Sequence, residues 1–149
     1  MDVSGNISAI LSQKGTEIFS VAPNATVFEA VGMMDEKNVG ALPVMDGEKL
    51  VGMISERDYT RKVMLRGKRS RDTKVSEIMS TNLTVTNPQE GVEKCLHLMT
   101  DKRIRHLPVL EGEKVVGIIS IGDLVKWVIS CQSAAIAHLE NYISGGYSG

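Results

Sequence analysis

The sequence predicts an α+β fold made of two copies of one supersecondary unit, and three observations carry this prediction. Residues 27–63 and 92–128 align at a constant offset of 65, with 15 of 37 positions identical. Each copy places two short apolar runs on either side of an acidic residue and Gly, between two amphipathic stretches. One unit of about 60 residues would bury little apolar surface by itself. The two copies are therefore expected to pack around a pseudo-twofold axis, with matched clefts between them.

Composition limits the classes of function. The net charge of -1 predicts no bulk attraction to nucleic acid or membranes, and no apolar run reaches the length of a membrane span. Cys95 and Cys131 have neither a metal-ligand nor a CxxC spacing, so a disulfide framework is not expected. The start, MDVSGNISAI, lacks the features of a signal peptide. We expect a cytoplasmic location, or a mitochondrial one if a transit peptide has been removed.

The first copy is predicted to run helix, strand, helix, β-hairpin, helix. Ile7, Ile10 and Leu11 give the leading helix one apolar face, and Thr26 with Glu29 fits a capping box for the second helix. Two apolar runs around Asp46-Gly47 predict the hairpin, in which Pro43 indicates an edge or an irregularity. The expected elements span residues 5–14, 18–21, 26–38, 40–55 and 56–66.

The second copy repeats this order, and its last helix is longer. That helix is expected to begin near Ile121, to run to Tyr142 and to end at Gly145-Gly146, before an irregular tail. Cys95 lies on the apolar face of its helix and is expected to be buried. The other expected elements span residues 74–79, 83–86, 89–102 and 106–120. The resulting organisation is a first repeat at 1–67, a linker at 68–73, a second repeat at 74–130 and an extension with tail at 131–149.

A Gly-x-x-Ser-x-x-Asp pattern ends the hairpin of each copy, at Gly52–Asp58 and Gly117–Asp123. In one interpretation Ser caps the following helix, and Asp accepts a hydrogen bond or complements the helix dipole. In the other, the helix start attracts a phosphate, the carboxylate accepts ribose hydroxyls, and Gly leaves room for the ligand. Spacing alone leaves both interpretations open.

The start of the hairpin differs between the copies. Gly40-Ala41 in the first copy corresponds to Arg105-His106 in the second. Two such side chains before a buried strand need a partner, which is either a carboxylate such as Asp58 or a ligand phosphate. His106 is not expected to bind a metal, because no second His or Cys lies at ligand spacing. The basic segment 56–74, with a charge of +5, is either a solvated helix and linker or a surface that attracts phosphates.

The doubled pattern resembles a tandem pair of CBS domains, a Bateman module. The VSEIM helix, LPV, an acidic residue with Gly, VGxIS and the final Asp carry the resemblance over about residues 5–130. The stretches SERDYTRKVMLRG, KRIRHLPV and GIISIGDLVKWVI resemble the small stand-alone CBS-pair proteins of bacteria and plant mitochondria. The resemblance implies two β-α-β-β-α repeats. It also implies binding of AMP, ADP, ATP or NAD(H) in clefts that the two repeats share.

The family's binding residues carry over to two sites. The resemblance implies that Asp58 holds the ribose at the first site and that Arg57, Arg105 and His106 hold the phosphate. The second site lacks the Arg-His pair, and Lys126 and Arg61 are possible outer contacts. The first site combines Ser55, Arg57, Asp58, Leu83, Thr84, Arg105, His106 and Pro108, and the second combines Ser120, Gly122, Asp123, Ile18, Ser20, Val39, Gly40, Ala41 and Pro43.

Two classes of function compete. The first is a non-catalytic regulatory module that binds an adenosine nucleotide, needs no metal and signals by a conformational shift to an unknown protein target. The alternative is a ligand-free structural or adaptor module that acts through protein contacts. An enzyme is not expected, because no nucleophile–base pair, Walker loop or metal cluster is present in the sequence. Apolar helix faces that need cover predict a homodimer.

Overall fold

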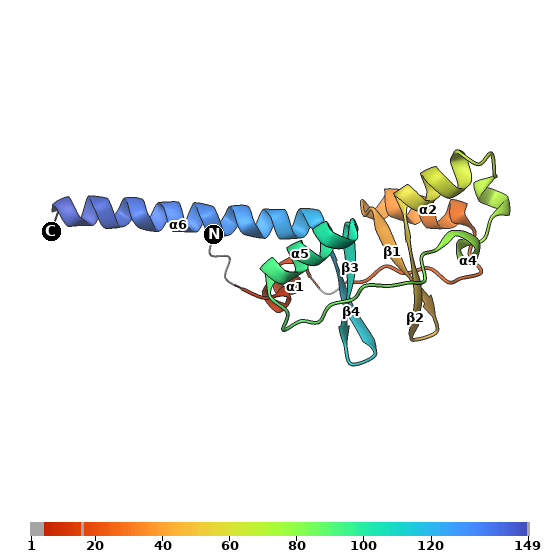
Figure 1. Ribbon diagram of the computed structural model, residues 1–149, viewed down its shortest axis with the longest axis horizontal. Coiled ribbons are helices and arrows are strands. Elements are labelled where there is room, and N and C mark those ends of the chain that lie inside the picture. Colours follow the sequence, from red (N-terminus) through yellow and green to blue (C-terminus); the bar gives the residue numbers. More distant parts are fainter. Residues whose placement is uncertain (1–4, 16, 149) are drawn as a thin grey trace. The chain divides into compact units, whose positions relative to one another are not determined.

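The structure is a computed structural model that describes residues 5–15 and 17–148, with side chains described up to residue 141. It divides into two compact units. The first unit contains residues up to 15, 86–107 and those from 119 onward. The second contains residues 17–85 and 108–118. The expected α+β composition of two repeats, each with a β-hairpin and helices, is confirmed (Figure 1).

The leading helices are exchanged between the repeats. Helix α1 (Ile7–Lys14) precedes the first copy in the chain but packs in the first unit, with the second copy. Helix α4 (Val75–Ile78) precedes the second copy and packs in the second unit, with the first. Matching backbone hydrogen bonds fix both helices: Ile7 N to Glu90 O at 2.9 Å and Val75 N to Ala25 O at 2.8 Å. Each compact unit is therefore built from both halves of the sequence.

Helix α2 (Val27–Lys37) begins at the predicted capping box. The Thr26 hydroxyl accepts a hydrogen bond from the Glu29 N–H at 3.1 Å, and the Glu29 carboxylate accepts one from the Thr26 N–H at 3.4 Å. The helix ends at Asn38, whose left-handed backbone (φ 55°) stops it. Val27, Ala30 and Met34 are buried on one face. The local signals in the sequence are sufficient to define this helix.

Strands β1 (Ala41–Asp46) and β2 (Lys49–Ser55) form the predicted antiparallel hairpin, with a bulge between Val44 and Met45. The Pro43 carbonyl accepts a hydrogen bond from Val21 N–H, and Met45 N–H donates to Val21 O, so the chain bridges around the missing N–H of Pro43. The predicted strand 18–21 is wrong as a strand, because only Val21 makes a bridge, to Val44.

The helix after β2 changes its winding. Helix α3 (Glu56–Tyr59) continues into a π-helical turn, η1 (Thr60–Met64), and Gly67, at φ 69°, ends the segment as predicted. The linker contains a short 3-10 turn, η2 (Ser70–Asp72). The core of this unit forms where α2, the hairpin, Val63 of η1 and α4 meet (Figure 1). Its members are Val21, Val27, Ala30, Met34, Leu42, Val44, Ile54, Val63, Val75 and Ile78.

The second copy forms helix α5 (Val92–Lys102) and the hairpin of β3 (His106–Glu111) and β4 (Lys114–Ser120). Helix α5 begins at residue 92 rather than at 89, because residues 88–90 form a turn instead. The predicted strand 83–86 is wrong, since only Thr86 makes a bridge. Cys95 is buried as predicted, and burial raises the pKa of its thiol, which lies 3.4 Å from the Thr86 hydroxyl.

Helix α6 (Ile121–Ser148) is longer than predicted. The expected end at Gly145-Gly146 is wrong, because the helical backbone passes through both glycines despite their cost of about 1 kcal/mol each. The expected tail is helical up to Ser148, and its last residue lies outside the described part. Among the described residues, no helix combines the length and the apolar character that a membrane span requires.

Candidate functional site

The first candidate site is the junction of β2 and α3, where Ser55 and Asp58 cap each other. The Asp58 carboxylate oxygen Oδ2 accepts hydrogen bonds from the Ser55 N–H at 2.9 Å and the Ser55 hydroxyl at 3.0 Å. The Asp58 N–H donates in turn to Ser55 Oγ at 3.2 Å. This reciprocal box satisfies two free N–H groups at the helix start. The capping interpretation of the sequence is therefore correct for one carboxylate oxygen.

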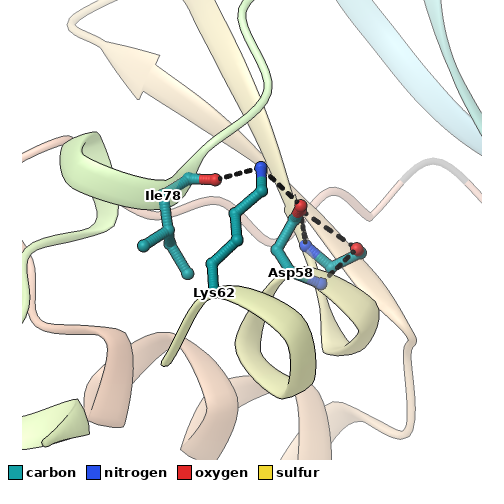
Figure 2. Close-up of polar contacts among 4 residues, drawn as sticks. Asp58, Lys62 and Ile78 are labelled. Carbon is teal, nitrogen blue, oxygen red and sulfur yellow. Dashed lines mark hydrogen bonds and ion pairs between the residues drawn. The ribbon is translucent and has the colours of Figure 1, made fainter. Parts of the chain in front are cut away.

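The other oxygen of Asp58 faces Lys62, one helical turn along. Lys62 Nζ lies 3.0 Å from Asp58 Oδ1 and donates a hydrogen bond of 2.8 Å to the Ile78 carbonyl at the end of α4 (Figure 2). The Asp58 side chain is 14% exposed, so this carboxylate needs such partners. Lys62 thus supplies a positive charge to the carboxylate and a donor to the carboxyl end of α4.

Gly52 does not serve the purpose that the ligand interpretation gave it. A Cβ atom at this position would lie 2.7 Å from Met79 Sδ and 3.0 Å from the Ser80 carbonyl oxygen. The space beside the strand is therefore filled by the chain itself, where Met53 and Ser80 exchange two backbone hydrogen bonds. Gly52 permits the segment after α4 to approach β2.

The apolar start of β1 lies beside this cap. Ala41 pairs with Ser55 in the hairpin register, and the Glu56 N–H donates to the Gly40 carbonyl at 3.1 Å. The structure therefore brings Gly40 and Ala41 together with Ser55 in the second unit. The predicted groups that combine Ser55 and Asp58 with Arg105 and His106, and Gly40 with Asp123, join residues of different units and stay a prediction.

The second candidate site is the junction of β4 and α6. The Asp123 oxygen Oδ2 accepts from the Ser120 N–H at 2.9 Å, and the Asp123 N–H donates to Ser120 Oγ at 3.1 Å. Lys14, at the end of α1, donates to the same oxygen at 2.7 Å. Burial alone would raise the pKa of Asp123, but hydrogen bonds from Lys14 and Ser120, with the Lys14 charge, outweigh burial and hold that pKa below its ordinary value.

Arg105 and His106 belong to the same unit as Asp123. The Arg105 carbonyl accepts a hydrogen bond from the Ile121 N–H at 2.8 Å, and the Arg105 side chain is exposed. Burial lowers the pKa of His106, and the charges of Lys14 and Arg105 lower it further, against the opposing Asp123 carboxylate. His106 is therefore neutral at pH 7 and can still donate one hydrogen bond.

The remaining predicted residues spread over several places. Ile18, Ser20 and Leu83 line an open depression with Met45 and Leu50, near the turn of the β1–β2 hairpin rather than at the cap. Arg57 and Gly122 are exposed on the first turns of α3 and α6, whereas Pro43 and Pro108 are buried in strands. Val39 donates its N–H to Met34 O, and Val39 and Thr84 are half-buried.

Sequence reasoning missed the two lysines that face the caps. The spacing of Asp58 and Lys62, four residues on one helix, is a signal that could have revealed the first pair. Lys14 and Asp123 are 109 residues apart, and their contact depends on the exchange of α1. No local pattern carries that information.

Part of the basic segment is occupied by contacts within its own unit. The Arg71 guanidinium stacks over the Phe28 ring at 3.8 Å, and Arg69 pairs with Asp72 at 3.7 Å. Lys62 is already paired with Asp58. For Lys62, Arg69 and Arg71, these contacts therefore favour the interpretation of the basic segment as a helix and linker rather than as a phosphate-binding surface. In the described ranges, no three His, Cys, Asp or Glu side chains gather as metal ligands would.

A family model for the CBS domain matches residues 10–65 and 75–130. The chain is 38% identical to the mitochondrial CBS domain-containing protein CBSX3 of Arabidopsis thaliana, with 97% of this chain and 74% of that protein aligned. It is 37% identical to the CBS domain-containing protein YhcV of Bacillus subtilis, over 88% of this chain and 93% of YhcV. The alignment with YhcV leaves little room for a further domain in that relative.

Two solved structures extend the comparison. The CBS domain structure NE2398 shares 43% identity, covers 84% of this chain and 98% of its own, and superposes with a TM-score of 0.81. The CBS domain pair of the protein MJ0100, in complex with 5′-methylthioadenosine and S-adenosyl-L-methionine, shares 26% identity at a TM-score of 0.74 and covers 82% of this chain and 98% of its own. One structural relative therefore binds adenosyl ligands.

Proposed function

The chain belongs to the CBS-domain family and contains a tandem pair of such domains, and on this premise we propose that it is a non-catalytic regulatory module that binds adenosine-containing ligands. The ligands of the sequence-based prediction are AMP, ADP, ATP and NAD(H). The complex of MJ0100 adds adenosyl thioethers and sulfonium compounds to this class. All share the adenosine group, and only some carry a phosphate.

The observation that supports the proposal most is the polar cluster at the start of α6. It combines an ionised, half-buried Asp123, the neutral His106, and the cations Lys14 and Arg105. A carboxylate can accept both hydroxyls of a ribose, and an exposed guanidinium can bind a phosphate with two hydrogen bonds. A cluster of this composition suits the sugar and phosphate of a nucleotide.

The cap in the second unit suits a different part of such a ligand. Asp58 offers a carboxylate with Lys62 beside it, and the half-buried Gly40 and the buried Ala41 stand where the other unit has Arg105 and His106. We expect this cap to favour adenosine itself over its phosphates. The sequence-based grouping, which combines Asp58 with Arg105, predicts instead that the site of Asp58 loses its phosphate preference when Arg105 is removed.

Lys14 links binding to a structural response. A ribose that takes the Asp123 carboxylate must share it with Lys14 or displace Lys14, because Lys14 donates to the oxygen that also serves the cap. Lys14 is the last residue of α1, so its release changes the anchoring of that helix. Such a ligand would shift the population of α1 positions, which a target protein could detect.

Calorimetric titration with adenosine, AMP, ATP, NADH and S-adenosylmethionine tests the proposal, supported by thermal unfolding. A ligand that binds only the folded chain must raise its stability, by about 2.7 kcal/mol at a hundredfold excess over Kd. Asp123→Asn should remove most of this gain. Asp101→Asn, the same change at an exposed position on α5, should leave it intact. If no compound binds at millimolar concentration, the adaptor function replaces this one.

A further inference from the structure

Helix α6 continues well beyond the core of its unit. Near its start Leu124 is fully buried, and the Trp127 ring lies so close to Gly5 that a Cβ atom there would be 2.6 Å away. From Gln132 to Asn141 every side chain is exposed, and Figure 1 shows α6 as one long continuous helix. A helical segment of this length without packing is marginal in water, because helix stability comes mostly from a buried face. The extension therefore needs a partner surface.

The exposed part of α6 carries an apolar stripe with a heptad pattern. Val125, Ile129, Ile136 and Leu139 are 46%, 55%, 58% and 58% exposed. With Gln132 between them, their spacings alternate four, three, four and three residues, which places all five on one face. Isoleucine occupies the a positions, and the d positions hold Val, Gln and Leu. This pattern is typical of a seam between two helices.

The stripe is separate from the face that packs in the unit. Leu124, Trp127, Val128 and Cys131 follow the spacing of three and four residues on a neighbouring face, and all four are buried or half-buried. The heptad stripe therefore does not repeat the core contact. Its four apolar residues are exposed and can contact a second helix.

Charge complementarity identifies the occupant as a second copy in antiparallel orientation. Lys126 and Glu140 both lie at e positions, on the same side of the stripe, and both are exposed. An antiparallel pair that sets Ile129 against the partner's Leu139 also sets Lys126 against the partner's Glu140. The twofold symmetry makes this contact twice. A parallel pair brings neither charge to an opposite charge.

We propose that the heptad stripe of α6 binds the same stripe of a second copy of the chain in an antiparallel coiled coil. Ser133 and Ala135, at the e and g positions that flank the stripe at the centre of the extension, are small, so the two helices can approach closely there. This contact goes beyond ligand binding, because none of the five residues of the stripe belongs to the two capped carboxylate sites.

The first test is the mass in solution, by light scattering and sedimentation. The wild-type chain should be at least a dimer, and Leu139→Glu should halve its mass and reduce its helical signal in circular dichroism. Ala134→Glu adds the same charge on the opposite face of α6 and should change neither quantity. A monomeric wild type at high micromolar concentration, or an unchanged mass in Leu139→Glu, would overturn the proposal.

A charge exchange tests the orientation. Lys126→Glu places glutamates opposite each other at both contacts, and Glu140→Lys places lysines there, so each single variant should raise the dissociation constant several-fold. The double variant restores opposite charges only if Lys126 meets the partner's Glu140, and its affinity should return to that of the wild type. Additive losses in the double variant contradict the antiparallel contact.

Discussion

The capped carboxylates of Asp58 and Asp123 make the same type of cap hydrogen bond, but each pairs with a lysine from a different part of the fold. In both, the Ser N–H donates to the Asp oxygen at 2.9 Å. Asp58 takes its lysine from the next turn of its own helix, whereas Asp123 takes Lys14 from α1. The residue equivalent to Lys62 in the second copy is Trp127, which packs against Gly5 instead. A local cap is thus repeated in both copies, whereas the charge partner differs with the surroundings.

A second difference lies at the start of the hairpin. Arg105 and His106 bring a cation and a neutral imidazole to the unit of Asp123, where Gly40 and Ala41 bring no ionisable group to that of Asp58. The two carboxylates therefore face unlike electrostatic surroundings. If both bind adenosine, they should differ in their preference for phosphate, and each of the following variants tests one part of that difference.

The largest effect should come from the carboxylates. Asp58→Ala and Asp123→Ala should each weaken one nucleotide site by roughly 1.5–3 kcal/mol, as the loss of a charged hydrogen bond does. Calorimetry of AMP and adenosine measures both losses. The exposed residues Asp35 and Asp101, changed to Ala, are the matched controls. Unchanged affinities in both site variants would remove the ribose role from these side chains.

Arg105→Ala should reduce AMP affinity by about 1.5 kcal/mol and leave adenosine binding nearly unchanged, because only AMP offers a phosphate to the guanidinium. The comparison of the two ligands in one calorimetric series isolates this contribution. Gly40→Arg, at the equivalent position, asks whether a cation suffices to create phosphate preference in the other unit. Equal losses for adenosine and AMP would mean that Arg105 only supports the fold.

The two lysines should contribute unequally to folding stability. Lys14→Met should lower the free energy of unfolding by about 1 kcal/mol, since it leaves a half-buried carboxylate with one charged partner fewer. Lys62→Met should cost about 0.5 kcal/mol, because Lys62 itself is 46% exposed and a pair four residues apart along one helical segment contributes little. Urea unfolding compares them. Equal effects would show that the exchange of α1 adds nothing to the ion pair.

The smallest effect should be the pH dependence from His106. Its folded pKa lies below 6.5, the value of the free side chain, so the unfolded chain binds the proton more readily. The stability that the neutral His106 side chain contributes to the folded state is complete above pH 6.5, and it is lost as the pH falls toward the folded pKa. His106→Asn should flatten the stability profile between pH 7.5 and 5.5, in urea unfolding at both pH values. A profile that keeps its slope would place the titrating group elsewhere.

Much of the fold follows from local signals in the sequence. The capping box of Thr26, the turn at Gly47 and the stop at Gly67 each depend on a few neighbouring residues, and the structure confirms all three. The predictions of strands at 18–21 and 83–86 were wrong, because an apolar run shows only that a segment is able to pair with another strand. Its pairing depends on distant backbone, and for the first of them only Val21 found a bridge partner, at Val44.

The candidate site shows the same limit. Ser55 with Asp58, and Ser120 with Asp123, were found from their spacing, and the structure confirms that each pair forms a cap. The contact of Lys14 with Asp123 could not be predicted, since the repeat alone suggests that α1 packs with the copy it precedes. In the structure, α1 is instead fixed to the second copy by the hydrogen bond from Ile7 N to Glu90 O, and α4 to the first copy by that from Val75 N to Ala25 O.

Calorimetric titration of AMP into the wild type, Asp58→Asn, Asp123→Asn and the double variant tests most directly whether the capped carboxylates hold the ribose. Asn has nearly the same shape as Asp and can still accept the cap hydrogen bond, so the helix starts should survive. The account predicts binding to the wild type, weaker binding in each single variant and none in the double variant. Wild-type affinity in the folded double variant would contradict it.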